Sequence, residues 1–169
     1  MTPTRAVLLS GLLLIFAANA GAKTVTKFGD GAAQVTIPSH YAKVEEGHEV
    51  LVVVSRPEGN VRLYFHLHKL DAALRVPRPG EAMVREQAEA KKKELKRRGN
   101  KFAFFDPGPT SEKDGRTFLN LHWQIGFGNT LVVMSAYIPK DARDLPDVKR
   151  FLSGDIESMI DSLRRIDGR

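Results

Sequence analysis

Two stretches of the chain alternate between apolar and polar residues, which is the pattern of a strand with one buried and one open face. The first runs from Val61 to Leu70, and its polar face carries Arg62, Tyr64, His66 and His68. The second runs from Thr117 to Ile125, and its less apolar face carries Phe118, Asn120, His122 and Gln124. Both stretches therefore predict strands of a sheet whose second face is rich in hydrogen-bonding groups.

Shorter apolar runs predict further strands, namely Val25–Phe28, Ala33–Ile37, Val50–Val54, Phe102–Phe105 and Leu131–Ile138. Turn residues separate several of them, in Pro57-Glu58-Gly59-Asn60, Asp114-Gly115 and Gly128-Asn129. The polar stretch Ser39–Glu46 predicts a connection or a single helical turn. Because tight turns join neighbouring strands, the sheet is expected to be antiparallel.

Two stretches predict helices. Glu81–Arg98 lacks Pro and Gly, carries its acids early and its bases late, and is followed by Gly99, which predicts its end. The closing helix is expected to begin at Asp144-Leu145-Pro146-Asp147, with an Asp cap and a first-turn proline. Its apolar residues recur every three or four positions up to Ile166, which indicates a core-facing helix. Gly154 within it costs about 1 kcal/mol relative to Ala and predicts close packing.

The predicted order is ββββ-α-βββ-α. We therefore expect an α+β fold with an antiparallel sheet of six to seven strands, flanked by two helices. Two helices cannot cover both faces of such a sheet completely. Part of one face is expected to stay open to water or to a partner.

Several anchor residues carry a resemblance to a known family. They are the strand Ala33–Pro38 followed by Tyr41, the hairpin Val50–Leu70 followed by a long helix, the Asp114-Gly115 hairpin leading to Trp123, and the closing Ser162-Leu163-Arg164. In these features and in element order, the chain resembles the PsbP-like fold superfamily, which includes DcrB-type bacterial envelope proteins. The resemblance implies an α/β/α sandwich around an antiparallel sheet, and a non-catalytic adaptor, assembly factor or binding module.

The first part of the chain predicts export. Arg5 precedes an apolar run from Ala6 to Ala18, and small residues follow at Ala20 and Ala22. This is the pattern of a secretory signal peptide, and the run is shorter than the about 20 residues of a membrane-spanning helix. We expect residues 1–22 to be a cleaved signal peptide, with the mature chain beginning at Gly21 or Lys23, and no transmembrane segment after cleavage. Residues 23–169 are expected to form a single domain.

Composition narrows the class of protein. The chain has 169 residues, a formal net charge of +6 and no cysteine, which excludes disulfide scaffolds, thiol nucleophiles and cysteine-ligated metal sites. Export without cysteine is typical of a bacterial periplasmic or secreted protein. The basic run from Lys91 to Arg98 lacks the interleaved aromatic residues of nucleic-acid binders, so it predicts a solvated face and no nucleic-acid partner.

The two polar strand faces give the candidate sites. If their strands lie close together, they form one surface of donors, acceptors and aromatic rings, with Tyr and Arg as residue types enriched in binding hot spots. The predicted partner-binding residues are Arg62, Tyr64, His66, His68, Asn120, His122 and Gln124. The alternative is a three-nitrogen metal site for zinc, copper or nickel, formed by His66, His68 and His122.

No catalytic motif accompanies these residues, so no enzyme and no cofactor are expected. The sequence therefore predicts a non-catalytic module that binds another envelope or secreted protein. Two uses stay open: an accessory or assembly factor of an envelope complex, and an immunity protein against a toxin delivered to the periplasm. A periplasmic metal-binding protein is the alternative, and a hydrolase with a deep pocket is a third hypothesis.

Overall fold

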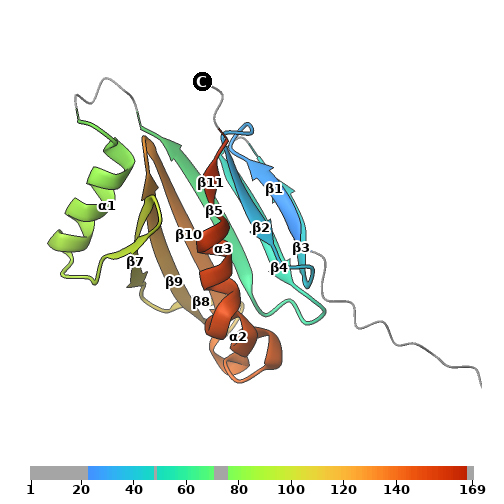
Figure 1. Cartoon of the computed structure of the whole chain (residues 1–169). Coiled ribbons are helices and arrows are strands. Elements are labelled where there is room, and N and C mark those ends of the chain that lie inside the picture. Colours follow the sequence, from blue (N-terminus) through green and yellow to red (C-terminus); the bar gives the residue numbers. More distant parts are fainter. Residues whose placement is uncertain (1–22, 48, 71–75, 167–169) are drawn as a thin grey trace, which may run out of the picture.

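The computed structural model describes residues 23–47, 49–70 and 76–166. They fold into three layers, shown in Figure 1, with a large antiparallel sheet in the middle. Helix α1(Pro79–Ala90) lies on one face of this sheet, and a smaller sheet with the C-terminal helices lies on the other. The predicted α+β class with an antiparallel sheet and flanking helices is therefore confirmed, although the strands form two sheets, of eight and three strands, instead of one sheet of six to seven. The predicted signal peptide, residues 1–22, lies outside the described residues.

The larger sheet has eight strands in the order β3-β4-β5-β10-β9-β7-β6, with β8 paired to β9. Their bounds are β3(Tyr41–Glu46), β4(Val50–Ser55), β5(Arg62–Lys69), β6(Lys96–Arg98), β7(Lys101–Pro107), β8(Ser111–Lys113), β9(Arg116–Phe127) and β10(Thr130–Pro139). The three predicted turns join β4 to β5, β8 to β9 and β9 to β10, all antiparallel. Strand β10 thus lies between the two alternating strands β5 and β9.

The smaller sheet has three antiparallel strands in the order β1(Thr24–Phe28), β2(Ala33–Ile37) and β11(Arg164–Arg165). A short 3₁₀ turn, η1(Lys140–Ala142), precedes the C-terminal helical region. This region consists of α2(Pro146–Arg150), the π-helical η2(Phe151–Asp155) and α3(Ile156–Ser162). Within the described residues, no helix is long and apolar enough to cross a bilayer.

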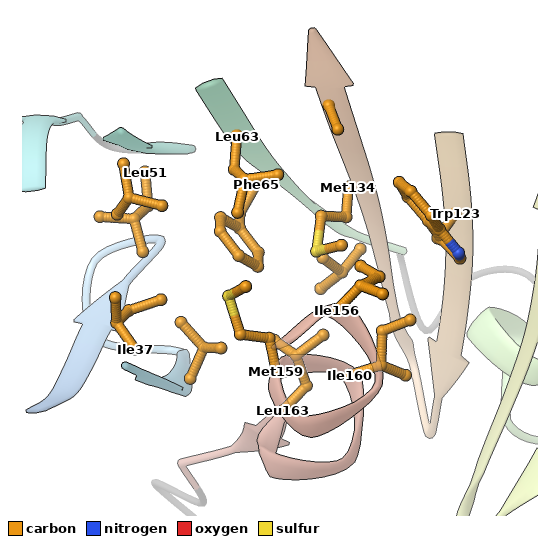
Figure 2. Packing of buried hydrophobic residues seen from close by; sticks show 14 of the residues in the cluster. Ile37, Leu51, Leu63, Phe65, Trp123, Met134, Ile156, Met159, Ile160 and Leu163 are labelled. Carbon is orange, nitrogen blue, oxygen red and sulfur yellow. The ribbon is translucent and has the colours of Figure 1, made fainter. Parts of the chain in front are cut away.

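The main core lies between the two sheets, where the C-terminal helices close it. Figure 2 shows Phe65 and Met134 of the larger sheet facing Ile37 of the smaller sheet and Met159 of α3. All four side chains are buried, and Trp123 closes the same cluster beside Ile160. The apolar faces predicted for β5 and β9 are therefore the inner face of the larger sheet.

A second, smaller core lies beneath α1. Val84 and Ala88 of the helix pack on Phe104 and Leu131 of the sheet. The helix comes close because the strand beneath it carries a glycine: a Cβ at Gly126 would lie 2.2 Å from the backbone oxygen of Gly80. This close approach fixes α1 over one end of the face opposite to the main core.

The predicted helix Glu81–Arg98 is wrong in its second half. Helix α1 ends at Ala90, and Lys92 adopts a left-handed conformation with a φ of 54°. The chain then forms β6, in which Lys96 pairs with Ala103, and Gly99 belongs to the turn before β7. Helix propensity favoured a continuation, but strand pairing with β7 overrides it.

Four local predictions are also wrong. The closing helix ends at Ser162 instead of continuing to Ile166, because Arg164 and Arg165 pair with β2. Ser39–Glu46 is mostly the edge strand β3, whose pairing with β4 shifts between Lys43 and Glu45, as in a β-bulge. The predicted Asp cap is absent, since the helix begins at Pro146 after Leu145 without a side-chain capping bond, although the first-turn proline is confirmed. Gly154 is exposed and has open space around it, not a close neighbour.

Candidate functional site

The seven predicted partner-binding residues share one face of the larger sheet, here called the outer face. Tyr64 of β5, Ser135 of β10 and His122 of β9 lie directly opposite one another in the antiparallel register. Opposed residues in such a ladder point to the same side. The predicted residues are therefore on one face, but β10 separates the four on β5 from the three on β9.

Helix α1 covers one end of the outer face. It packs on Leu131 and Phe104, and the partly buried Val133 lies against the same cluster. In the register, His68 is opposite Leu131, and Gln124 is opposite Val133. These two predicted residues thus belong to the end of the face that the helix occupies, whereas Arg62 and Tyr64 lie toward the other end.

The uncovered end of the outer face is hollowed into a groove of about 450 Å³. One wall is the turn between β4 and β5 at Glu58–Asn60, and the other is the β8–β9 hairpin. Its aromatic lining consists of Tyr64, Phe118 and Tyr137. The volume lies in the range of about 300–1,000 Å³ that is typical of ligand pockets.

The rings in the groove are arranged as a connected aromatic surface. Tyr64 and Tyr137 meet edge to face, with their centroids 5.3 Å apart and their planes at 79°. The guanidinium of Arg62 lies 5.7 Å from the centroid of the Tyr64 ring, within the range of cation–π attraction. Tyr137 is 37% exposed, so this cluster offers aromatic surface to a partner.

Asn120 and His122 do not line the groove, and their side chains bond to neighbouring segments of the protein. The Asn120 amide nitrogen donates to the carbonyl oxygen of Pro109 over 2.6 Å, and its amide oxygen accepts a hydrogen bond from Ser111. His122 Nδ1 lies 2.9 Å from the hydroxyl oxygen of the buried Ser135. The Asn120 contacts hold the segment that leads into β8 and so position the hairpin wall, whereas the His122 contact joins β9 to β10.

The three histidines of the alternative metal site are not brought together. His66 and His68 lie on β5, and His122 lies two strands away on β9, a separation of about 10 Å at the usual strand spacing. In the described part of the chain, no group of three His, Cys, Asp or Glu residues is placed to hold a metal ion. Burial, and then the neighbouring His68, lower the pKa of His66.

The basic run after α1 is partly tied to the sheet. Lys91 and Lys93 both form ion pairs with Asp106 of β7, and hydrogen bonds from Lys91 hold the pKa of Asp106 below its usual value despite partial burial. Arg98 forms ion pairs with Glu157 and Asp161 of α3. The run therefore serves largely to attach the α1–β6 connection to its neighbours.

A buried carboxylate supports the other wall of the groove. Asp147 is 3% exposed and accepts hydrogen bonds from the Ser55 hydroxyl, at 2.7 Å, and from the backbone and side-chain nitrogens of Asn60, both at 3.3 Å. Because Asn60 belongs to the turn that lines the groove, Asp147 attaches this turn to α2. From the sequence, Asp147 is expected only at the start of a helix, and its role in the groove wall follows from the structure.

Several groove residues were missed in the sequence. The groove is also lined by Tyr137, Lys113 and Arg116, which the sequence did not single out. Phe118 lines it too, and the sequence pattern predicts the correct face for this residue but does not assign it to the site. Tyr137 is exposed between the buried Ala136 and Ile138, but the nearly continuous apolar run of β10 gives no alternation that would single it out. Lys113 and Arg116 flank the Asp114-Gly115 turn, where charged residues are common and carry no such signal.

The fold and the groove define an α+β sandwich with one sheet face that is half covered by a helix and half open. No protein-family model and no curated protein matches the chain. Solved structures match it at low identity. A crystal structure from Bacteroides thetaiotaomicron is 16% identical with a TM-score of 0.63, covering 88% of this chain and 49% of that one, so this chain spans about half of that protein's length.

Two further structures match over nearly their whole length. LpqN of Mycobacterium tuberculosis, which is involved in cell envelope biogenesis, is 10% identical with a TM-score of 0.51, covering 88% of this chain and 93% of that one. The cyanobacterial PsbP (CyanoP) of Synechocystis is 11% identical with a TM-score of 0.40, covering 89% and 96%. LpqN and this chain share a fold, and the α+β architecture described above is consistent with the predicted PsbP-like fold. The narrower resemblance to DcrB-type proteins stays a prediction.

Proposed function

We propose that this protein is a non-catalytic binding module of the bacterial cell envelope, and that it docks on another envelope or secreted protein through the groove. The observation that carries the proposal is the exposed cluster of Tyr64, Tyr137 and Arg62 at the end of the sheet that α1 leaves uncovered. Tyr and Arg are enriched among residues that dominate binding energy, because they combine large contact area with directed polar groups.

Other features support the proposal. The side chains whose pKa values are displaced, among them Tyr41, Lys101 and Asp147, do not line the groove, whereas a catalytic site would concentrate such groups. The apolar run of residues 6–18 and the small residues after it support export. LpqN, which shares the fold, acts in cell envelope biogenesis.

Site-directed photo-crosslinking in the native cells tests the proposal. A photoreactive phenylalanine analogue is placed at Tyr137, in the full chain. The control carries it at Leu152, which is exposed to a similar extent, 42%, but belongs to η2 on the opposite side of the larger sheet. One dominant crosslinked adduct is expected from position 137. This adduct should be absent when the analogue is at position 152, and it should be lost in the Tyr64→Ala variant.

Equal labelling from both positions, or an adduct that persists in Tyr64→Ala, would overturn the proposal. The identity of the adduct separates the two uses. A component of an envelope complex indicates an accessory or assembly factor, and a secreted toxin indicates an immunity protein.

A further inference from the structure

The charges around the groove are not evenly paired. Lys113 and Arg116 are directly opposite each other across the β8–β9 hairpin, so both side chains emerge on the same face. Like charges in this position repel and destabilise a hairpin. Arg116 is compensated by Asp141, whose carboxylate oxygens lie 3.0 and 3.2 Å from its terminal nitrogen. No carboxylate in the described part of the chain forms an ion pair with Lys113.

A second cation enters the groove from the other side. Arg62 projects from β5 on the outer face and lies over the Tyr64 ring, and it too forms no ion pair with any described carboxylate. The acids of the groove, Glu58 and Asp114, belong to exposed turns at its rim. The strands therefore present positive charge on both sides of an aromatic floor, and the two acids that line the groove stand at its rim.

We infer that the groove binds an acidic segment of the partner, with carboxylates held by Arg62 and Lys113 and an aromatic or apolar residue packed between Tyr64 and Tyr137. The inference rests on the proposed function and names the chemistry of its partner. A carboxylate between the hairpin and β5 supplies Lys113 with a counter-charge, as Asp141 already does for Arg116. An aromatic residue of the segment completes the edge-to-face packing that the two tyrosines begin.

The test uses the mature chain and a short synthetic peptide with the sequence Glu-Asp-Tyr-Asp-Glu, blocked at both ends. The neutral control peptide is Gln-Asn-Tyr-Asn-Gln, which keeps the shape and removes the charges. Binding is followed by the NMR shifts of the backbone amides of β5 and of the β8–β9 hairpin. The acidic peptide is expected to shift these amides and to bind with an affinity at least about tenfold higher than that of the neutral peptide. Its binding is expected to weaken as the salt concentration rises from about 50 to 300 mM, because salt screens exposed charges.

Two double variants separate charge in the groove from charge elsewhere. Arg62→Gln with Lys113→Gln removes the two positive charges while keeping long polar side chains, and it is expected to reduce acidic-peptide affinity about tenfold or more. Lys92→Gln with Lys96→Gln makes the same change in net charge at exposed positions outside the groove, and it is expected to leave the affinity within about twofold. A thermal melt of each variant confirms that it is folded.

Three results would overturn the inference. One is an absence of shifts with the acidic peptide, and another is equal binding of the neutral peptide. The third is preferential perturbation of the same amides by phosphatidylglycerol vesicles, which would assign the groove to an anionic lipid headgroup. The proposed function is tested separately. A specific crosslinked adduct at position 137 without peptide binding would support the groove as a docking surface and would contradict only the acidic nature of the segment that it binds.

Discussion

The carboxylate of Asp147 and the hydroxyl of Ser55 join α2 to β4 through a hydrogen bond of 2.7 Å between two buried side chains. The same hydroxyl accepts a hydrogen bond from the backbone nitrogen of Val61, at 3.0 Å. One buried pair therefore holds a helix, the end of β4 and the start of β5 in a fixed arrangement. The turn between these two strands forms one wall of the groove.

Replacement of Asp147 tests this connection. Asp147→Asn removes one acceptor that serves both Ser55 and Asn60, and we expect it to lower the free energy of unfolding by about 2 kcal/mol, because buried donors lose their charged acceptor. The measurement is urea denaturation at neutral pH. Asp144→Asn, at a fully solvated carboxylate nearby, is the matched control and is expected to change stability little.

The same pair predicts a pH dependence. Burial opposes ionisation of Asp147, but hydrogen bonds from Ser55, Asn60 and the Val148 backbone outweigh it and hold its pKa below the usual value. A carboxyl with a lowered folded pKa contributes stability above its unfolded pKa, near 3.9, and loses it as the pH falls through the folded value. The stability difference between wild type and Asp147→Asn should therefore shrink as the pH falls below about 4. A constant difference down to pH 2 would contradict this assignment.

Lys101 forms a second buried connection. It is 5% exposed, and its ammonium group donates to the carbonyl oxygens of Asp161 and Leu163 at the end of α3, over 2.6 and 2.7 Å. Lys101→Met leaves both carbonyls without this donor, so we expect a loss of about 2 kcal/mol. Lys113→Met, at an exposed lysine of β8, provides the comparison in the same denaturation experiment, and equal effects of the two would show that the contacts of Lys101 are unimportant.

Gly126→Ala is expected to destabilise the contact between α1 and the sheet. Its Cβ would lie 2.2 Å from the Gly80 backbone oxygen and 2.8 Å from a methyl group of Val84. Backbone cannot move aside as a flexible side chain can, so the cost is expected at the upper end of the about 1–3 kcal/mol typical of overpacking. Differential scanning calorimetry measures it, and a melting temperature equal to that of wild type would refute the close approach.

The same substitution at Gly154 has the opposite expected sign. Gly154 lies in η2 with a helical backbone and open space where a Cβ would be. Ala there reduces the conformational freedom of the unfolded chain without a clash, so we expect stabilisation by about 0.4–1 kcal/mol. Because both variants add one methyl group to a glycine, they form a matched pair in one calorimetric series. Destabilisation by Gly154→Ala would indicate that the π-helical turn needs glycine.

Periodicity predicted the strands best where one face is buried. Leu63, Phe65 and Leu67 on β5 and Trp123 and Ile125 on β9 all face the main core, as the alternating pattern requires. It failed where burial does not set the pattern. Strand β3 exposes Lys43, Val44 and Glu45, so its alternation carries no signal of an inner face.

The sequence predicts which face of the sheet the candidate site residues occupy, but not which strands lie next to each other. Arg62 and Tyr64 were placed correctly on an open surface, because their direction follows from the pleat alone. Alternation cannot show that β10 separates β5 from β9, since strand order depends on long-range pairing. For the same reason, the sequence could not show that Asn120 holds Pro109 and Ser111 instead of facing a partner.

The walls and the floor of the groove belong to different kinds of structure. The floor is built on β5, β9 and β10, whose register also determines the main core, whereas the walls are the chain reversals at Glu58–Asn60 and around Asp114. Substitutions at exposed positions of these reversals that keep the loop length and turn type leave strand register unchanged. The lining of the groove can therefore change at its two loops while the main core stays the same, which makes these loops natural positions for diversification in evolution or in a designed library.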